Sequence, residues 1–207
     1  ATAAWSRMLA GNRRFSQNAA EHPWQDQDTR TSLLNEQHPD AVVLSCSDSR
    51  VPPEIIFDQG LGDIFTIRTA GEVLDEAVVA SLEFAESTLH VALMVVLGHE
   101  HCGAIAATIP ALDALTDRAT LDGHSSPDAL IAGSDSIIMR SVGASIQQSR
   151  ESELDATDDY ERVHVARTIE MLVDRSAIIR EALAGGRLMM VGARYLLSTG
   201  KVEVLSF

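Results

Sequence analysis

Short apolar runs alternate with stretches of helical periodicity along most of the chain. Five runs rich in β-branched and other apolar residues predict strands at residues 41–44, 64–67, 91–97, 188–191 and 201–205. Between them, apolar residues recur at helical spacing and predict helices at residues 76–89, 136–149 and 160–183. Strands that alternate with helices are typical of an α/β protein with a mostly parallel sheet flanked by helices. Thr199-Gly200 marks a tight turn, so we expect the last strand to form an antiparallel edge.

The first 15 residues predict an amphipathic helix. Trp5, Met8 and Leu9 share one face of this helix, and Phe15 lies further along. This apolar face must pack on something, which leaves two alternatives open. The helix covers its own domain, or it docks across an interface with another subunit. Residues 1–35 are therefore interpreted as an N-terminal helical arm.

Two polar segments interrupt the pattern. Residues 110–135 are rich in Asp, Gly, Ser and Pro and lack clear periodicity, so we expect a surface excursion there and not a domain boundary. The acidic residues 151–159 are interpreted as a solvated connection between helices. The length of 207 residues suits a single α/β domain that spans residues 1–207.

Composition restricts the partners of the protein. The formal net charge of −14 argues against nucleic acid and against anionic membrane surfaces, because few basic side chains are present to neutralise phosphates. No apolar run approaches the roughly 20 residues that a membrane-spanning helix needs. Arg7, Arg13 and Arg14 make the first 15 residues unlike the apolar region of a signal peptide. Two cysteines do not suggest a disulfide scaffold. We expect a cytoplasmic protein with a small-molecule substrate.

Two short motifs contain both cysteines of the chain. Cys46-Ser47-Asp48-Ser49-Arg50 follows the first predicted strand, and His99-Glu100-His101-Cys102 follows the third. Ligand sites of α/β sheets form beyond the carboxyl ends of the strands, so adjacent strands would bring Cys46, His99 and Cys102 together. Two thiolates and one imidazole supply three of the four ligands of tetrahedral zinc, and an open fourth position is typical of a catalytic site.

The first motif also contains a carboxylate and a guanidinium that suit zinc chemistry. Zinc with two thiolates and a neutral imidazole has no net charge, so it should acidify bound water less than zinc held by three histidines. An ionised Asp48 that faces a metal-bound oxygen accepts hydrogen bonds only and therefore selects hydroxide. Arg50 lies two residues on and, along an extended segment, would keep Asp48 ionised through a forked contact.

Each of these residues has a simpler explanation when it is taken singly. A cysteine after an apolar strand is often a small core residue, and a histidine at a strand end is often a hydrogen-bonded loop residue. Asp48 and Arg50 could form a surface ion pair worth about 1 kcal/mol or less. The rival classes of protein are a noncatalytic zinc-stabilised binding module and a thiol-redox protein. The redox interpretation lacks a Cys-x-x-Cys pair and leaves Asp48 and Arg50 without a role.

Taken together, the motifs resemble those of the β-class carbonic anhydrases. The resemblance rests on Cys-Ser-Asp-Ser-Arg-Val-Pro at 46–52 and Gly-His-x-x-Cys-Gly-Ala at 98–104, and it extends to residues 10–15 and 63–71. The resemblance implies a catalytic dyad and a set of zinc ligands, which are Asp48 and Arg50, and Cys46, His99 and Cys102. It also implies a homodimer or homotetramer with active sites near the dimer interface and the N-terminal helix docked on the partner subunit.

The resemblance further suggests the substrate pocket of the plant-like subgroup. Gln37 matches a glutamine that reaches the substrate oxygen, Phe65 matches an apolar wall residue, and Phe84 takes a position often held by Tyr. The backbone N–H of Gly103, at the expected start of a helix, is a further candidate for substrate contact. A second subgroup has a noncatalytic bicarbonate pocket that involves Trp three residues before the first cysteine ligand. Val43 occupies that position here, which argues against such a pocket.

The expected activity is the zinc-dependent, reversible hydration of carbon dioxide to bicarbonate and a proton, with zinc-bound hydroxide as the nucleophile. An alternative is the hydrolysis of carbon disulfide or carbonyl sulfide on the same scaffold. His38, His90 and His101 are candidates for the proton shuttle, because histidine titrates near neutral pH. The family also has a closed form, in which Asp48 would take the fourth zinc position at low pH, and we keep this form as a hypothesis.

Overall fold

The computed structural model describes residues 1–122 and 126–205, and within them the strands form one five-stranded sheet. The strands are β1 (Ala41–Cys46), β2 (Ile64–Thr69), β3 (Leu93–His99), β4 (Met189–Tyr195) and β5 (Val202–Val204). They lie in the order β2-β1-β3-β4-β5. The first four are parallel, whereas β5 pairs antiparallel with β4. The predicted α/β class and its antiparallel edge strand are therefore confirmed.

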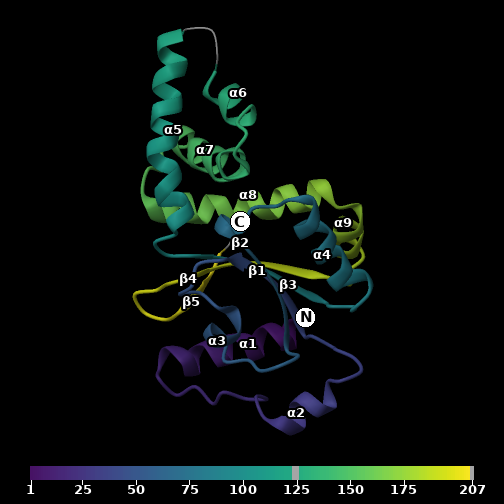
Figure 1. Cartoon of the computed structure of the whole chain (residues 1–207). Helices are drawn as coiled ribbons and strands as arrows, with labels where there is room; N and C mark the ends of the chain where they lie inside the picture. The colour runs from purple at the N-terminus through teal and green to yellow at the C-terminus, as the bar shows by residue number, and fades with distance from the viewer. Residues whose placement is uncertain (123–125, 206–207) are drawn as a thin grey trace.

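Helices cover both faces of this sheet (Figure 1). They are α1 (Thr2–Ser16), α2 (Gln27–Ser32), α3 (Pro53–Ile56), α4 (Glu76–Ser87), α5 (Gly103–Asp122), α6 (Pro127–Ala132), α7 (Ala144–Glu151), α8 (Thr157–Arg175) and α9 (Ala177–Ala184), with a 3-10 turn η1 (Ala70–Glu72) and a π-helix η2 (Met139–Gly143). Figure 1 shows α1 and α3 below the sheet and α4, α8 and α9 above it. Helices α5, α6 and α7 stand on the outer side of α8.

The two central strands owe their apolar sequences to burial on both faces. Every residue of β1 and β3 is buried. Successive side chains of a strand point to opposite faces, so Val43 packs on the α1 side, whereas Val42 and Leu44 pack with α4 and α9. The core on the α1 side continues past the carboxyl ends of the strands to Ile105 and Leu112 of α5. The carboxyl ends of β1 and β3, where the two motifs lie, are therefore held in place by apolar packing.

Residues 110–135, where we expect a surface excursion without clear periodicity, are largely helical. Helix α5 continues through Pro110 to Asp122, and α6 follows, whereas residues 123–125 lie outside the described part of the chain. Proline removes the N–H that would donate to the carbonyl four residues earlier. The helix persists because its inner face stays in the core, where Leu112 is fully buried. Tertiary packing therefore outweighs the local signal of a helix-breaking residue.

The prediction of a single helix at residues 160–183 is wrong, because this segment is divided into α8 and α9 at Ser176. Ser176 has an extended backbone (φ −114°, ψ 109°), and its Oγ accepts a hydrogen bond from the backbone N–H of Ile179 (3.1 Å). The same hydroxyl donates to Oε1 of Glu83 on α4 (2.6 Å). Ser176 therefore caps α9 and ties the break to a neighbouring helix.

The other two predicted helices are present. Residues 76–89 correspond to α4, which begins and ends within about two residues of the prediction. Residues 136–149 correspond to η2 and α7, with a π-helical turn that the periodicity did not indicate. A turn of this type is rare and often lies beside a functional site.

Helix α1 packs closely against its own chain. Gly11 lies so near the end of α3 that a Cβ built on it would be 1.8 Å from the carbonyl oxygen of Phe57. The side-chain amide of Asn12 donates to the carbonyl of Ile56 (3.1 Å) and accepts from the backbone N–H of Val202 (2.8 Å). The structure of the chain thus has the helix on its own domain. Docking of α1 on a partner subunit stays a prediction.

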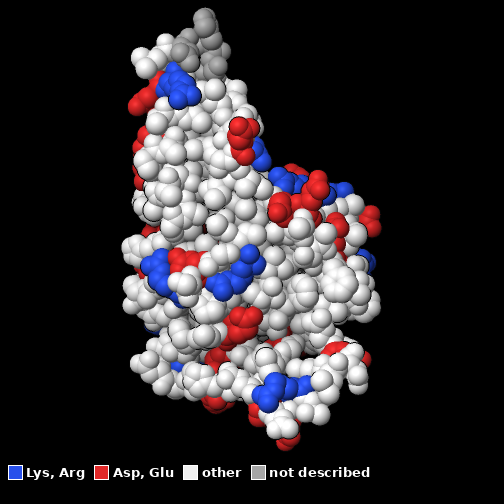
Figure 2. Space-filling view, viewed as in Figure 1, with Lys and Arg blue, Asp and Glu red and all other residues white. Residues whose placement is uncertain are grey.

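Charged side chains of both signs are interspersed on the face drawn in Figure 2, where small groups of Lys and Arg lie beside Asp and Glu. The described residues form no continuous basic tract on this face. Over the whole chain, 30 acidic residues outnumber 16 basic ones. Within the part of the chain that the structure describes, no helix is both long and apolar enough to cross a bilayer.

Candidate metal centre

Two sulfurs and a ring nitrogen converge where β1 and β3 end. Cys46 is the last residue of β1, His99 is the last residue of β3, and Cys102 immediately precedes α5. The two strands are parallel neighbours, so their carboxyl ends meet at the same edge of the sheet. One donor atom from each of the three residues lies within 4.8 Å of the others, and all three residues are buried. The structure thus brings together the side chains that the sequence indicated as zinc ligands.

One ring nitrogen of His99 has a hydrogen-bond partner, and the other has none among the described residues. Its Nδ1 lies 2.9 Å from the carbonyl oxygen of Glu100, and a carbonyl only accepts, so Nδ1 carries the proton. Its Nε2 is buried without a hydrogen-bond partner among the described residues. Burial lowers the pKa of His99, but the contact with Cys46 and the Glu100 carbonyl outweigh burial and raise it. The lone pair of Nε2 is therefore available to a metal ion in the tautomer that Glu100 selects.

The two cysteines are free thiols that interact with each other. Hydrogen bonding with Cys102 lowers the pKa of Cys46 to about 4, and the same contact together with burial raises the pKa of Cys102. The backbone N–H of Gly71 also donates to Sγ of Cys46 (3.4 Å). Hydrogen bonds of this kind stabilise a thiolate, which is the form that binds metals.

This donor set fits zinc. Two cysteine sulfurs and one histidine nitrogen are the soft and borderline ligands that zinc prefers over carboxylates alone. The orphaned Nε2 of His99 would gain a partner, and a divalent ion would compensate the charge of the thiolates that bind it. Among the described residues, the group contains three donors, which is the ligand number of many catalytic zinc sites.

Asp48 and Arg50 form the forked ion pair that the sequence predicted. Arg50 donates from Nε to Oδ1 (2.9 Å) and from Nη2 to Oδ2 (2.7 Å) of Asp48. The expected extended segment is wrong, because the chain turns here. The backbone N–H of Arg50 donates to Oδ1 of Asp48 (2.9 Å), and that of Val51 donates to the Asp48 carbonyl (3.1 Å). Hydrogen bonds from Arg50 hold the pKa of Asp48 far below its usual range.

Arg50 also joins the two motifs. Its Nη2 donates to the carbonyl oxygen of His101 (3.1 Å), which lies between His99 and Cys102. In this arrangement Asp48 is paired with Arg50 and lies outside the three-donor group. The closed form, with Asp48 as a fourth ligand, stays a hypothesis.

Arg68 is a structural support of the site that sequence reasoning missed. It lies on β2 opposite Ser45, and its guanidinium donates to the carbonyl oxygens of Cys46 (Nε, 2.9 Å) and Asp48 (Nη2, 2.6 Å). A guanidinium that spans two carbonyls fixes the backbone of the first motif. Arg68 belongs to residues 63–71, which carry the family resemblance, so the sequence contains a signal for this support.

A second missed support lies behind Cys102. Glu161 of α8 is buried and pairs with Arg194 of β4 (Oε2 to Nε, 2.7 Å), which itself is almost fully buried. Burial raises the pKa of Glu161, although Arg194 and the backbone N–H of Cys102 favour its charged form. Asp158 and Glu203 complete the surroundings of the arginine. A buried ion pair between α8 and β4 therefore lies near a candidate ligand.

Three predicted substrate contacts do not lie at this centre within the chain. Gln37 is exposed in the loop that leads to the amino end of β1. Phe65 pairs with Val42 near the amino end of β2 and packs against Phe84 at a centroid distance of 6.2 Å. Strands rise about 3.3 Å per residue, so Phe65 is about 13 Å from the level of Thr69, which is opposite Cys46.

Gly103, by contrast, lies beside the centre. It is the first residue of α5 and directly follows Cys102. A Cβ built on Gly103 would meet no atom within 4 Å, so space is open next to its backbone. The N-terminus of a helix favours partial negative charge on a ligand. Its predicted role as a substrate contact is compatible with this position.

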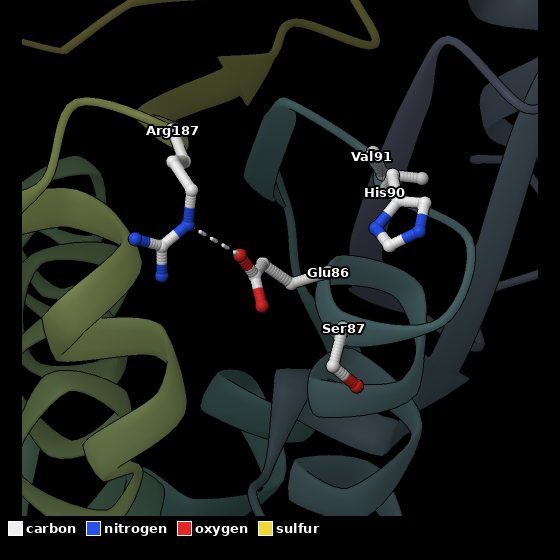
Figure 3. Close-up of a pocket in the computed structure, with 5 residues that line it drawn as sticks. All are labelled: Glu86, Ser87, His90, Val91 and Arg187. Carbon is white, nitrogen blue, oxygen red and sulfur yellow. Dashed lines mark ion pairs between the residues drawn. The ribbon is translucent and has the colours of Figure 1, made fainter.

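The three histidines proposed as proton shuttles lie in different places. His101 is exposed between the two ligands of the second motif. His38 is exposed in the loop before β1, and His90 lines a surface pocket of about 550 Å³ with Glu86, Ser87, Val91 and Arg187. Figure 3 shows Arg187 and Glu86 pointing toward each other across this pocket. The pocket lies at the amino end of β3, about 20 Å along the strand from His99. Only His101 is near the metal centre.

Comparisons with known proteins agree with this geometry. The sequence profile of the carbonic anhydrase family matches residues 41–202. Carbonic anhydrase 2 of Mycobacterium tuberculosis is 44% identical over 199 residues, which are 96% of this chain and 90% of that protein. A carbonic anhydrase of Mycolicibacterium smegmatis is 43% identical over 204 residues, which are 99% of this chain and 93% of that protein.

Solved structures of low sequence identity share the fold. The β-carbonic anhydrase CcaA has a TM-score of 0.69 at 23% identity, with 98% of this chain and 95% of that chain covered. One of two tetrameric β-carbonic anhydrases from Sordaria macrospora has a TM-score of 0.68 at 21% identity, with 96% and 95% covered. Because the family profile spans most of the chain and the two bacterial relatives cover nearly all of it, the chain belongs to the carbonic anhydrase family and has the β-carbonic anhydrase fold.

Proposed function

We propose that this protein catalyses the reversible hydration of carbon dioxide to bicarbonate and a proton, with one zinc ion per chain held by Cys46, His99 and Cys102. The observation that carries the proposal is the convergence of these three donors within 4.8 Å beside the ion-paired Asp48. Membership of the carbonic anhydrase family supports it. Zinc supplies a Lewis acid that lowers the pKa of bound water toward neutrality.

Asp48 is proposed to orient the nucleophile. A carboxylate oxygen accepts about two hydrogen bonds. Among the described residues, Oδ1 of Asp48 accepts two hydrogen bonds from Arg50, one from the backbone N–H and one from Nε, whereas Oδ2 accepts one, from Nη2. Oδ2 therefore retains capacity for a proton donor on the attacking oxygen. Because Asp48 stays ionised, it cannot donate in return, so it directs a lone pair of that oxygen toward the substrate.

Arg50 and Gly103 are proposed to support this step from either side. Arg50 keeps Asp48 charged and fixes its rotamer through the forked contact. The backbone N–H of Gly103, at the start of α5, is oriented to stabilise negative charge that develops on a substrate oxygen. The open space beside Gly103 suits a small, uncharged substrate such as carbon dioxide.

We propose further that a second copy of the chain supplies Gln37, Phe65 and Phe84 to each site. In their own chain these residues lie toward the amino ends of the strands, whereas Cys46 lies at the carboxyl end of β1. The solved relatives from Sordaria macrospora are tetrameric, which supports a homo-oligomer here. Light scattering of the purified protein should report a dimer or tetramer, and a monomer with full activity would refute the proposal.

Subunit mixing tests the sharing of residues directly. In a heterodimer of Asp48→Asn and Gln37→Ala chains, one of the two sites combines an intact Asp48 with the intact partner Gln37. The purified heterodimer should therefore recover toward half of the wild-type activity, and a random mixture of the two co-expressed chains toward a quarter. If Gln37 acts within its own chain, every site keeps one defect and no recovery occurs.

Stopped-flow hydration of carbon dioxide tests the activity itself. The zinc-loaded protein should accelerate hydration, and the Asp48→Asn variant should do so far less. Turnover of carbon disulfide without turnover of carbon dioxide would assign the protein to the alternative hydrolase. A protein with full zinc and neither activity would instead be a zinc-stabilised binding module.

We also propose a cytoplasmic location. Cys46 and Cys102 are both free thiols, and a reducing compartment preserves that state. Cell fractionation with detection of the native protein would test the location, and recovery outside the cytoplasmic fraction would contradict it.

A further inference from the structure

The 3-10 turn η1 adopts a backbone that its own sequence does not favour. Gly71 and Glu72 both have left-handed dihedrals, with φ of 66° and 49°. Glycine accepts this region readily, but a residue with a long side chain does not. Such a conformation persists where contacts with the surrounding structure hold it in place. The turn therefore needs an external contact to hold it.

His164 of α8 provides that contact. Its Nε2 lies 2.6 Å from the carbonyl oxygen of Gly71, and because the carbonyl only accepts, Nε2 donates. Its Nδ1 then carries no proton and accepts, so the hydroxyl of Ser145 at 2.8 Å donates to it in this tautomer, although the same hydroxyl also lies 3.1 Å from the carbonyl oxygen of Ser141. Burial lowers the pKa of His164, which keeps the ring neutral and in this tautomer. Each ring nitrogen of His164 thus has a hydrogen-bond partner, Gly71 for Nε2 and Ser145 for Nδ1.

The carboxyl of Glu72 lies beside the ring of His164 but does not replace Gly71 as the partner of Nε2. Oε2 of Glu72 is 3.8 Å away, which is beyond hydrogen-bond distance, and its Oε1 has no hydrogen-bond partner among the described residues. The Nε2 proton of His164 is therefore directed to the Gly71 carbonyl.

The turn connects this ring to the candidate metal centre. The backbone N–H of Gly71 donates to Sγ of Cys46 (3.4 Å), while the carbonyl of the same residue accepts from His164. We propose that His164 is a positioning residue that holds the η1 turn so that the Gly71 N–H stays directed at the Cys46 sulfur. This inference rests on the proposed zinc site.

A chemical effect on the metal centre follows from this arrangement. An N–H that donates to a thiolate withdraws electron density from the sulfur, so the sulfur passes less charge to a bound metal ion. The centre stays more electrophilic than two unassisted thiolates would leave it. Outer groups that orient metal ligands commonly change metal affinity by about 10- to 100-fold when they are removed.

Cobalt substitution gives a readout that activity does not. A cobalt(II) ion held by cysteine shows a sulfur-to-metal charge-transfer absorption, whose energy falls when the sulfur becomes more electron-rich. In the His164→Leu variant this absorption should move to longer wavelength, and zinc affinity should change by about 10- to 100-fold. In His164→Gln the amide nitrogen can still donate to the Gly71 carbonyl, so the absorption should return toward the wild-type position.

Thr168→Val is the matched control. Thr168 lies one turn further along α8, is fully buried, and its Oγ1 has no hydrogen-bond partner among the described residues. The variant perturbs the same buried helix without touching the donor to Gly71, so the cobalt absorption should stay in place. If His164→Leu does not fold, Ser145→Ala takes its place, because it removes the hydroxyl that selects the tautomer and should produce a smaller shift in the same direction.

The outcomes separate this inference from the proposed function. An unchanged absorption in folded His164→Leu, or an equal shift in Thr168→Val, would overturn the role of His164. Failure of His164→Gln to differ from His164→Leu would overturn it too. A wild-type protein with no sulfur-to-cobalt absorption would contradict the proposed metal centre itself.

Discussion

Arg50 donates two parallel hydrogen bonds to the carboxylate of Asp48, from Nε to Oδ1 (2.9 Å) and from Nη2 to Oδ2 (2.7 Å). This pair leaves one carboxylate oxygen with spare capacity beside the candidate zinc ligands. The proposed mechanism depends on that oxygen staying charged and correctly oriented.

The Asp48→Asn variant should retain zinc and lose about 100-fold or more in kcat/KM for carbon dioxide hydration, because an amide cannot replace a charged acceptor. Stopped-flow assays and metal analysis of the same sample measure both effects. Asp113→Asn is the matched control, since Asp113 also pairs with an arginine, Arg150 (2.8 Å), but away from the centre. Equal activity in the two variants would remove Asp48 from the mechanism.

Asp58 should make stability depend on pH. Burial works to raise the pKa of Asp58, but the backbone N–H groups of Glu21 and His22 and the side chain of Arg14 outweigh it and lower the pKa. A folded-state pKa below the unfolded value of about 3.9 means that the stabilisation is present above that pH. It is lost as the pH falls through the folded-state pKa.

The Asp58→Asn variant should therefore be less stable than the wild type at pH 7, by about 1–3 kcal/mol in free energy of unfolding. The difference should shrink below about pH 4, where the Asp58 carboxylate of the unfolded chain begins to protonate before that of the folded chain. Urea denaturation at several pH values measures it. Asp26→Asn should show little change, because asparagine caps a helix as well as aspartate does. A pH-independent difference for Asp58→Asn would contradict the lowered pKa.

Arg194 should be essential for stability because it neutralises Glu161. Arg194→Met leaves Glu161 buried without its partner and should cost about 3–5 kcal/mol in free energy of unfolding. The double variant with Glu161→Gln should recover part of this loss. Arg162→Met removes a half-exposed pair with Glu203 and should cost about 1 kcal/mol or less. Thermal or urea denaturation compares the three, and a mild effect of Arg194→Met would show that Glu161 is not held charged.

The sheet and the metal centre were predictable because burial leaves a direct signal in the sequence. β1 and β3 are covered on both faces, so their sequences are continuous apolar runs. A motif that follows such a run must lie at the carboxyl end of a buried strand. The spacing of Cys46, His99 and Cys102 then needed only strand adjacency, which the parallel pairing of β1 with β3 provides.

The sequence pattern is misleading about helices where packing or a distant contact outweighs a local signal. Pro110 and the polar residues after it hid the helical spacing of Ile109, Leu112 and Leu115, which continues α5. Ser176 breaks the predicted long helix through a hydrogen bond to Glu83, a residue far away in sequence. Local composition does not contain such a contact.

The supports of the site were hidden for the same reason. His164 is one polar residue in a helix, and nothing in its neighbours along the chain indicates the carbonyl of Gly71 as its partner. Arg194 likewise finds Glu161 only after β4 and α8 pack together. Gln37 and Phe65 are predicted from the family resemblance, and their distance from the metal centre within one chain is the reason for proposing that a second copy completes the site.

The most direct test of this account is the zinc content of purified, dialysed protein, measured by elemental analysis on the wild type, His99→Ala and His90→Ala. His90 is a histidine at the opposite end of β3 and serves as the control. We expect one zinc ion per chain in the wild type and in His90→Ala, and almost none in His99→Ala. A wild-type protein without zinc, or full zinc content in His99→Ala, would contradict the proposed centre.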